Sequence, residues 1–506
     1  MSNQVNRLLV VVIIIVVTVL FLVSLNQRLP YHGNLMASDV CLTFESSTYL
    51  YNWLNAGIFN LKARMLKTQV SIEAPEGGTP YASYPPGFLI FPYLLALIIN
   101  NEGTVPFVQG YNLFNHWLTA CLFSLIVYFI FNRTKSIKPV TGAMISIFAG
   151  AVVIFVPGMF YYFQFEYYSE IAALPIAAGI ILLEILQYDL NENKKHKGII
   201  KTIQYFLIFY GCFTDYYCWF IVIVISLVRL ITTKYGAIKE FLIESLKLFA
   251  PAGVAALLFM LYLKFSVGDF NIFFSRYTQR SSFPINMSWL RRVMHFSYYL
   301  YSGWVLRILL FIFIVFILLA FFIFIFYRHN KKLMTLVGWG FVSLLPSFLI
   351  TIILSEHVYF HDFTLLRMLF PLVILLFAIC PSIISAICAL WVTNEKAQKM
   401  LLTAISAILI VGSIATASYA FIQRKIYFDV RWPNRFDFEP QKITYKLAEY
   451  DDYIFVCPSQ LDVAYQPVYS HKQMHTVSEQ LSDMIKQAKD IPDCTNVCFL
   501  IVKNPT

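Results

Sequence analysis

Charged residues are scarce in this sequence of 506 residues. Asp, Glu, Lys and Arg together make up 13% of it, whereas soluble domains carry about 25%. Hydrophobic residues make up 59%, and uncharged runs such as 8–25 and 308–326 have the ~20-residue length that crosses a ~30 Å hydrocarbon core. Because lipid tolerates only a backbone that satisfies its own hydrogen bonds, these runs are predicted to be helices. The chain is therefore expected to be an all-α polytopic membrane protein.

Three other absences narrow the class further. The nine cysteines show no metal-ligand spacing. No cofactor is expected, and the pairing of Cys457, Cys494 and Cys498 in the C-terminal tail is left open. No internal repeat is evident, which argues against a transporter built from repeated halves. The first apolar run is long for a signal peptide, and no A-x-A-like cleavage site follows it. That run is therefore interpreted as a retained span.

The net charge of +10 is concentrated between the apolar runs. The basic residues gather in six stretches, 1–7, 132–139, 189–201, 233–247, 328–332 and 394–399. Together these hold 16 basic and 5 acidic residues, a surplus of 11 that accounts for the whole net charge. Because loops rich in Lys and Arg stay in the cytoplasm, we expect all six stretches there and no nucleic-acid partner.

With these loops inside, the topology has about eleven spans. They are expected at 8–25, 109–131, 140–157, 169–188, 202–213, 216–232, 248–265, 303–327, 333–354, 364–390 and 400–421. The apolar segment 88–99 is short and contains Pro92, and counting it as a crossing would place Arg133 outside. We therefore expect it to be a half-helix that enters from the outer side, while 158–168 is expected to be a polar external segment.

This topology places the N-terminus in the cytoplasm and the C-terminus on the outer face of the inner (plasma) membrane. Residues 1–421 are expected to form one transmembrane domain. Residues 422–506 are expected to form a small exported α/β domain, with strands at 452–456 and 497–502 and a helix at 478–489 whose apolar residues share one face.

The first external loop carries two carboxylates, Asp39 and Glu45. The segment 43–56 that follows suits an amphipathic helix on the membrane surface, ended by Gly57. In the ordinary interpretation both carboxylates are solvated groups near a helix start, where negative charge is favoured anyway. In the functional interpretation one of them is a catalytic base on the outer face.

Further acidic positions are expected on the same face. Glu170 opens the span 169–188, and Glu166 four residues earlier is predicted to share its helix face. Asp215 lies at the tip between two short helices. His361 and Asp362, with His357 nearby, precede the span 364–390. Carboxylates at the edge of a membrane span are functional candidates by default.

Arginines near these carboxylates suit an anion. Arg367 lies one turn inside its span, where it either pairs with phosphate or carboxylate or extends to the surface. The external segment 266–300 adds four more, which are Arg276, Arg280, Arg291 and Arg292. Aromatic residues surround them, so this segment is expected at the headgroup level, where the arginines attract anionic lipid or hold a substrate phosphate.

In order and placement, residues 8–421 resemble the GT-C superfamily of multi-spanning glycosyltransferases. This superfamily includes protein O-mannosyltransferases, lipid A aminoarabinose transferases and uncharacterised bacterial members. The resemblance rests on an acidic residue soon after the first span, on Glu170 at the start of a later span, and on three short motifs. These motifs are Tyr84-Pro85-Pro86, Thr214-Asp215-Tyr216-Tyr217 and His361-Asp362-Phe363. Many members have adjacent Asp-Glu in the first loop, whereas Asp39 and Glu45 are six apart here, so either is the match.

The resemblance implies a sugar donor on a polyprenyl phosphate and an acceptor that is a lipid, a glycan or a protein. Asp39, Glu45 or Glu170 would serve as the catalytic carboxylate, and the five arginines would bind the donor phosphate. Tyr84, Asp215, His361 and Asp362 would contact substrate, and a lipid monophosphate donor would need no metal. Two alternatives remain: a transporter or flippase of a lipid-linked saccharide, and a membrane subunit without catalysis.

Overall fold

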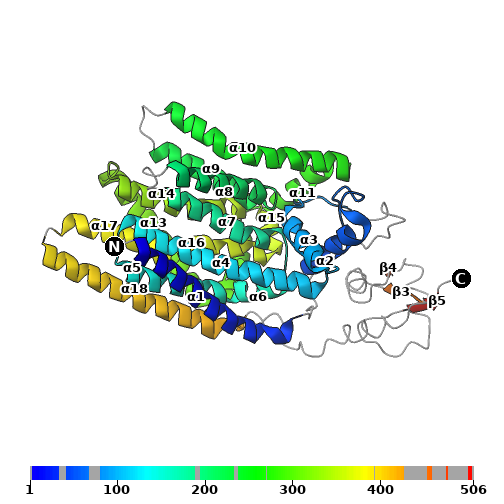
Figure 1. Ribbon diagram of the computed structural model, residues 1–506, viewed down its shortest axis with the longest axis horizontal. Helices are drawn as coiled ribbons and strands as arrows, with labels where there is room; N and C mark the ends of the chain where they lie inside the picture. The colour runs from blue at the N-terminus through cyan, green and yellow to red at the C-terminus, as the bar shows by residue number, and fades with distance from the viewer. Residues whose placement is uncertain are drawn as a thin grey trace.

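The computed structural model describes residues 3–32, 41–67, 80–187, 194–232, 238–268, 270–392, 394–426, 453–457, 474–476 and 500–503. Long helices run roughly along one axis, and short helices gather at one end of the bundle (Figure 1). The N-terminus lies towards the opposite end.

The first half of the chain alternates long helices with short elements. These are α1 (Asn3–Arg28), η1 (Leu29–Tyr31), α2 (Cys41–Asn52), η2 (Trp53–Gly57), β1 (Met65–Leu66), β2 (Pro80–Tyr81), α3 (Gly87–Ile99), α4 (Val105–Thr134), α5 (Pro139–Phe155), α6 (Pro157–Phe165), α7 (Ser169–Leu186), α8 (Lys194–Cys212) and α9 (Tyr216–Thr232).

The second half is also helical, apart from three strands near its end. Its elements are α10 (Ile238–Tyr262), η5 (Leu263–Val267), α11 (Asn271–Ser281), α12 (Met287–Tyr301), α13 (Gly303–Phe326), α14 (Lys331–Ile353), α15 (Ser355–Phe360), η6 (Asp362–Met368), α16 (Leu369–Ile374), η7 (Leu375–Ile379), α17 (Cys380–Trp391), α18 (Glu395–Gln423), β3 (Tyr453–Cys457), β4 (Met474–Thr476) and β5 (Leu500–Lys503).

Within the described residues, eight helical stretches are long and apolar enough to cross a membrane. They are α1, α4, α7, α10 with η5, α13, α14, the continuous stretch from η6 to α17, and α18. The pair α5 and α6, bent by 56° at a short break, forms a ninth if it is one span. The other two expected spans correspond to α8 and α9, and α9 is apolar but short. The polytopic all-α architecture is confirmed, with eight or nine crossings by this measure instead of eleven.

The segment 158–168, expected to be polar and external, is largely helical and buried. Residues 157–165 form α6, and all nine of its residues are buried. Pro157 has no N–H and cannot continue the ladder of α5, so the chain bends and starts a new helix. The tyrosines and Gln164 of α6 gave the segment a polar composition, although it lies inside the bundle.

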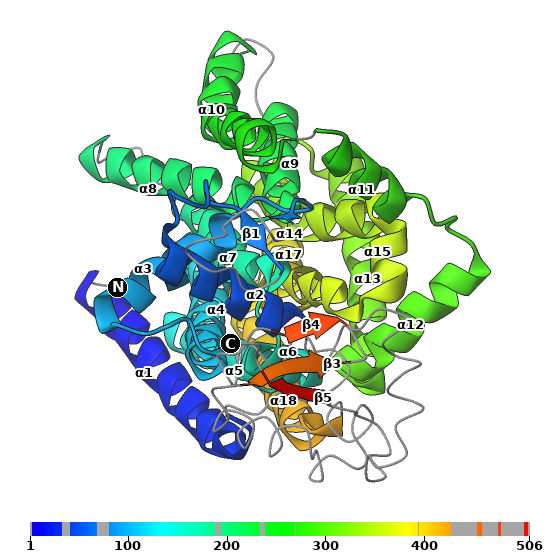
Figure 2. The ribbon, with the colours of Figure 1, turned by 90° about the vertical axis from the view of Figure 1, so that its right-hand side faces the viewer.

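Two glycines shape the outer-end elements. Gly57 ends the α2–η2 helix with a φ of +85°, as expected, but Tyr49 and Trp53 of this helix are buried against the bundle. Gly87 starts α3, where an added Cβ would lie 2.1 Å from Phe213 O. Only glycine permits this approach, which the Gly87 N–H uses to bond Phe213 O at 3.0 Å. An end-on view shows α2, α3 and β1 together, with α11 and α12 along another side (Figure 2).

The strands are few. β1 pairs antiparallel with β2 through Met65 and Tyr81. In the tail, β3 lies between β4 and β5, parallel to β4 and antiparallel to β5. β3 and β5 fall on the strands expected at 452–456 and 497–502, whereas the helix expected at 478–489 lies outside the described residues.

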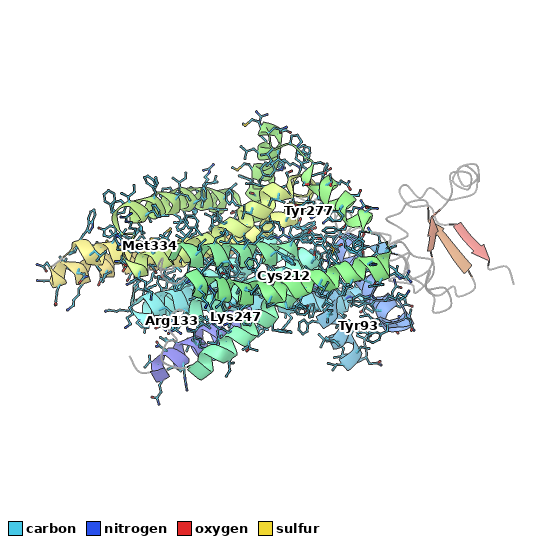
Figure 3. All side chains as sticks on the ribbon, turned by 90° about the horizontal axis from the view of Figure 1, so that it is seen from above. Tyr93, Arg133, Cys212, Lys247, Tyr277 and Met334 are labelled. Carbon is cyan, nitrogen blue, oxygen red and sulfur yellow. The ribbon has the colours of Figure 1, made fainter. Side chains whose placement is uncertain are left out.

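The labelled side chains mark the two ends of the helical bundle. Arg133 and Met334, which flank basic stretches, lie towards one end of the bundle, and Tyr93 and Tyr277 lie towards the other (Figure 3). The short elements α2, α3, α11 and α15 cluster at this second end. The expected separation of basic loops from the segments carrying candidate site residues is therefore present in the fold.

Candidate functional site

Glu170 lies at the centre of a buried polar cluster. It is in the first turn of α7 and is 2% exposed. Tyr84 Oη donates to Glu170 Oε1 at 2.5 Å, and Ser169 Oγ donates to Oε2 at 2.9 Å. His357 Nε2 lies 2.9 Å from Oε1. Three donors from three segments of the chain therefore converge on one carboxylate.

The protonation state of His357 follows from its burial. Burial lowers the pKa of His357 to about 3, so the ring is neutral near neutral pH. A neutral ring that faces a carboxylate through Nε2 must carry its hydrogen there, so Nε2–H donates to Glu170. The exposed His361 ring packs beside it, with centroids 4.7 Å apart. His357 thus connects the buried cluster to the surface at α15.

Tyr84 stands between β2 and α3, where the proline pair fixes the chain. Burial raises the pKa of Tyr84 well above its usual value, so the phenol keeps its proton and remains a donor. Its ring lies 5.1 Å from that of Tyr216, and Tyr216 Oη donates to Ser83 O at 2.7 Å. The α8–α9 turn therefore holds the Tyr84 segment in place.

Arg280 lies beside this cluster and has an unused hydrogen-bond donor. Its guanidinium carbon lies 4.6 Å from the Tyr84 ring centroid, and Nη2 donates to Tyr81 Oη at 3.2 Å. Nη1 is buried and has no hydrogen-bond partner among the described residues. A half-buried guanidinium with an unused N–H edge is suited to bind an anion such as phosphate.

Arg367 occupies a different position from the one expected for a phosphate ligand. Its Nη2 lies 3.0 Å and 3.1 Å from the two carboxylate oxygens of Asp215, and both side chains are nearly inaccessible. The Tyr217 N–H also donates to Asp215 Oδ1. The charge of Arg367 is therefore neutralised inside the protein, and the pair joins the α8–α9 turn to η6.

Glu45 lies near this cluster in α2. Lys67 Nζ is 2.8 Å from Glu45 Oε1, and Tyr49 Oη donates to Oε2 at 2.9 Å. The Glu45 side chain is 12% exposed, which is more than for Glu170. Lys67 also lies 5.5 Å from the centroid of the Tyr81 ring. Glu45, through Lys67, and Glu170, through Tyr84, are thus both connected to the aromatic residues around Tyr81.

Backbone-directed hydrogen bonds hold α2 against the start of α7. Thr43 Oγ1 donates to Phe165 O at 2.5 Å and accepts from the Tyr167 N–H at 2.7 Å. Ser46 Oγ donates to Tyr167 O at 2.8 Å. These backbone groups lie at the break between α6 and α7, where the helical hydrogen bonds are interrupted. Polar side chains of α2 therefore bond backbone groups that would otherwise lack partners.

The remaining predicted residues lie in several places. Arg276 and Arg291 are exposed on α11 and α12, and Arg292 stacks 4.3 Å from the Phe296 ring. Asp362 is buried and accepts a hydrogen bond from Tyr162 Oη at 2.5 Å. Asp39 lies outside the described residues.

One local expectation is corrected. Glu166 and Glu170 do not share a helix face, because Glu166 has extended dihedrals in the break between α6 and α7.

Some site residues carried no sequence signal of their own. Lys67 follows a short strand in a region without periodicity, and Tyr81 is one of 32 tyrosines. Ser169 was visible only as the neighbour of Glu170. Among the described residues, no group of three His, Cys, Asp or Glu side chains is arranged to hold a metal ion.

Solved structures of other proteins are similar to this chain over most of its length. The chain is similar in structure to ArnT from Cupriavidus metallidurans bound to undecaprenyl phosphate, with 11% identity, coverage of 94% of this chain and 88% of that chain, and a TM-score of 0.55. It is also similar to the apo oligosaccharyltransferase of Archaeoglobus fulgidus, with 10% identity, coverage of 95% and 65%, and a TM-score of 0.53.

A third similar structure is the oligosaccharyltransferase AglB of Archaeoglobus fulgidus in complex with an inhibitory peptide and a dolichol-phosphate. It shows 11% identity, coverage of 92% of this chain and 64% of that chain, and a TM-score of 0.50. The chain thus spans less than two thirds of the length of these archaeal proteins. No family model matches the chain, and no curated protein matches its sequence. The chain therefore has a GT-C-like fold, the fold of these membrane glycosyltransferases.

Proposed function

We propose that the chain is an integral membrane glycosyltransferase that moves a sugar from a polyprenyl-phosphate donor to an acceptor on the outer face. The observation that carries this proposal is the Arg280 guanidinium. It presents an unused, buried N–H edge next to Tyr84 and the Glu170 cluster. Solved structures of the same fold include one bound to undecaprenyl phosphate and one bound to a dolichol-phosphate.

The chemistry requires two groups at the site. The acceptor oxygen or nitrogen forms a bond to the anomeric carbon while the bond from that carbon to the phosphate oxygen breaks. The leaving lipid phosphate takes the electron pair, and a nearby base takes the acceptor proton. Arg280 stabilises the negative charge that develops on the phosphate, in a setting where aromatic rings exclude water and strengthen the interaction.

The carboxylates divide between two roles in this proposal. Glu170 already accepts three hydrogen bonds and is nearly inaccessible, so it orients Tyr84 and His357. Glu45 is more exposed and lies in the first external loop, which also contains Asp39. We assign the acceptor proton to a carboxylate of this loop, Asp39 or Glu45, because an entering acceptor can reach it.

The remaining arginines act elsewhere in this proposal. Arg367 is neutralised by Asp215, and the exposed Arg276, Arg291 and Arg292 suit contact with anionic headgroups. We propose a monophosphate donor, as the resemblance to the GT-C superfamily implies. We further propose that residues 422–506, as expected from the sequence, lie on the outer face.

Conservative substitution at Arg280 tests the proposal. Membranes containing Arg280→Lys are incubated with radiolabelled polyprenyl-phosphate sugars, and transfer is measured against donor concentration. Lysine keeps the charge but lacks the planar fork, so transfer at limiting donor should fall about tenfold or more. Arg276→Lys, one helical turn away on α11 and exposed, is the matched control and should follow the wild-type curve.

Two results would argue against this function. Normal donor curves for both Arg280→Lys and Arg280→Ala would remove the phosphate contact. Passage of label across reconstituted vesicles without any covalent product would instead support a transporter or flippase of a lipid-linked saccharide.

A further inference from the structure

The break between α5 and α6 leaves backbone carbonyls without helix partners. Pro157 has no N–H, so the carbonyl of Val153, four residues earlier, cannot be bonded within the helix. The chain bends by 56° at this point. The ladder resumes where the Phe160 N–H bonds Val156 O at 2.9 Å. In the membrane such unpaired carbonyls need partners from elsewhere in the protein.

Two side chains from other helices provide these partners. His116 Nε2, from α4, lies 3.0 Å from Val153 O, and Arg28 Nη2, from the end of α1, donates to Ile154 O at 3.3 Å. The two side chains also bond each other, with Arg28 Nη1 2.9 Å from His116 Nδ1. Because arginine only donates, Nδ1 is the acceptor and the ring hydrogen is on Nε2. Every one of these contacts is therefore a donor–acceptor pair with a fixed direction.

The pair is packed directly against α6. Both side chains are 0% exposed. The Arg28 guanidinium carbon lies 4.1 Å from the centroid of the Phe160 ring, and the His116 ring stacks on Phe163 at 4.6 Å with an 8° angle. Arg28 also faces the carboxyl end of α5, where the helix dipole favours a positive charge. The salt bridges of the described residues do not include it, so the carbonyls of the broken helix are the negative groups that its two Nη atoms face directly or through His116.

The direction of α6 determines two parts of the candidate site. At its far end Tyr162 Oη bonds Asp362 at the start of η6. Asn112, one turn before His116 on α4, donates to Tyr162 O and Glu166 O at 3.1 Å and 2.7 Å. Four residues later the chain reaches Glu170. A change in the bend would move both attachment points.

We infer that Arg28 and His116 are positioning residues, which cap the carbonyls released at Pro157 and so hold the bent span that presents Glu170 and Asp362. Their effect on transfer rests on the proposed function, whereas their effect on the bend does not. A residue that only stabilised the protein would change activity in proportion to stability. If the residue positions the site, activity can remain low in a variant whose stability has been restored.

A double-mutant cycle tests the cap. His116→Leu removes the donor to Val153 O and should lower the thermal midpoint of the purified protein. Pro157→Ala restores an N–H to that carbonyl, so His116→Leu combined with Pro157→Ala should regain at least half of the loss. Pro251→Ala, in the interior of α10, is the matched control and should show no coupling with His116→Leu. Additive effects of the His116 and Pro157 changes would overturn the cap.

Positioning is tested in the same variants. The double variant should remain impaired in transfer, by about tenfold or more, because a straightened α6 misplaces the site. Recovery of transfer along with stability would overturn the positioning role. Tyr162→Cys combined with Asp362→Cys, bridged by a short, membrane-permeant bifunctional methanethiosulfonate, reports the same geometry without any activity. Cross-linking should be efficient with native Pro157 and His116 and lost in the double variant; undiminished cross-linking there would also overturn the role.

Discussion

Glu170 shows how a buried carboxylate is retained at the edge of a membrane. Its oxygens receive hydrogen bonds from Tyr84, Ser169 and His357, so its lone pairs are used inside the protein. A buried charge without such donors would cost several kcal/mol. Glu170 is also only 2% exposed, whereas the Glu45 side chain is 12% exposed, which is why Glu170 suits orientation of its neighbours better than proton removal from an entering acceptor.

The Tyr84 hydroxyl provides a direct test at this scale. Tyr84→Phe removes one donor to Glu170 but keeps the ring under Arg280. A hydrogen bond to a charged group contributes roughly 1.5–3 kcal/mol, so stability should fall by about that amount. Transfer should fall with it, and the dependence on donor concentration should change little. Thermal unfolding and donor titrations measure both effects, with exposed Tyr277→Phe as the control. If Tyr84→Phe changed the dependence of transfer on donor concentration as strongly as Arg280→Lys, the assignment of donor binding to Arg280 and of structural support to Tyr84 would be contradicted.

His357 gives a prediction about pH. Burial lowers the pKa of His357 to about 3, whereas the unfolded side chain titrates near ~6.5. Between these values the unfolded chain binds a proton that the folded protein does not, so this residue costs stability as the pH falls through ~6.5, by up to about 1.4 kcal/mol per pH unit. His357→Gln removes this loss while its amide can still donate to Glu170. The thermal midpoint should therefore fall less between about pH 7.5 and about pH 5 in the variant; equal slopes would exclude a neutral buried His357.

At the scale of elements, the α8–α9 turn connects three parts of the site. Phe213 O bonds the start of α3, Tyr216 Oη bonds the segment before Tyr84, and Asp215 pairs with Arg367 of η6. The helices α8 and α9 therefore carry a turn that contacts three other parts of the site in addition to its own local hydrogen bonds. This explains why a turn with only weak sequence signals is central to the architecture.

Breaking the Asp215–Arg367 pair should be more harmful than replacing it. Removal of one member of a buried ion pair leaves an uncompensated charge and costs about 3–5 kcal/mol, whereas apolar replacement of both is often nearly neutral. Asp215→Leu and Arg367→Met should each lower the yield of folded protein strongly, and the double variant should recover much of it. Size-exclusion profiles and thermal midpoints of the three variants measure this. Similar damage in all three would mean that the charges act separately, as they would if Arg367 bound a substrate phosphate.

At the scale of the whole molecule, the orientation of the two ends depends on one feature. The helices α8 and α9 are a pair, so they leave the parity of the crossings unchanged whether or not they cross. The bent pair α5–α6 decides between eight and nine crossings. An odd number puts the ends of the chain on opposite sides. The basic stretches favour this arrangement, with the N-terminus in the cytoplasm.

A reporter fusion tests this topology. A reporter active only in the cytoplasm should be silent when fused after Thr506, and one active only outside should give a signal. The same cytoplasmic reporter inserted in the basic stretch 189–201 should be active and serves as the positive control. Cytoplasmic activity after Thr506 would mean an even number of crossings, and the cluster around Glu170 would need a new assignment of sides.

Much of the architecture was determined by the sequence alone. Apolar run length and the distribution of Lys and Arg are properties of consecutive residues, and lipid imposes them on every span. They predicted the helical bundle and the short apolar helix at 88–99. Local sequence patterns predicted the helix that ends at Gly57 and strands at 452–456 and 497–502, which overlap β3 and β5. The GT-C-like fold followed from the order of short motifs, of which Glu170 and Tyr84 meet in the structure.

The contacts of the site were decided only by the tertiary structure. Hydrogen bonds join residues as far apart as Tyr84 and Glu170, or Glu170 and His357, and no local pattern encodes such a distance. Composition gave no sign that 158–165 is buried, because tyrosine and glutamine are polar on average but are buried in α6 by packing. Arg28 and Arg367 carried the same charge in the sequence as Arg280. Burial and the position of their partners made the first a cap for a broken helix and the second half of an ion pair. The third stacks on Tyr84, and its buried Nη1 has no partner among the described residues.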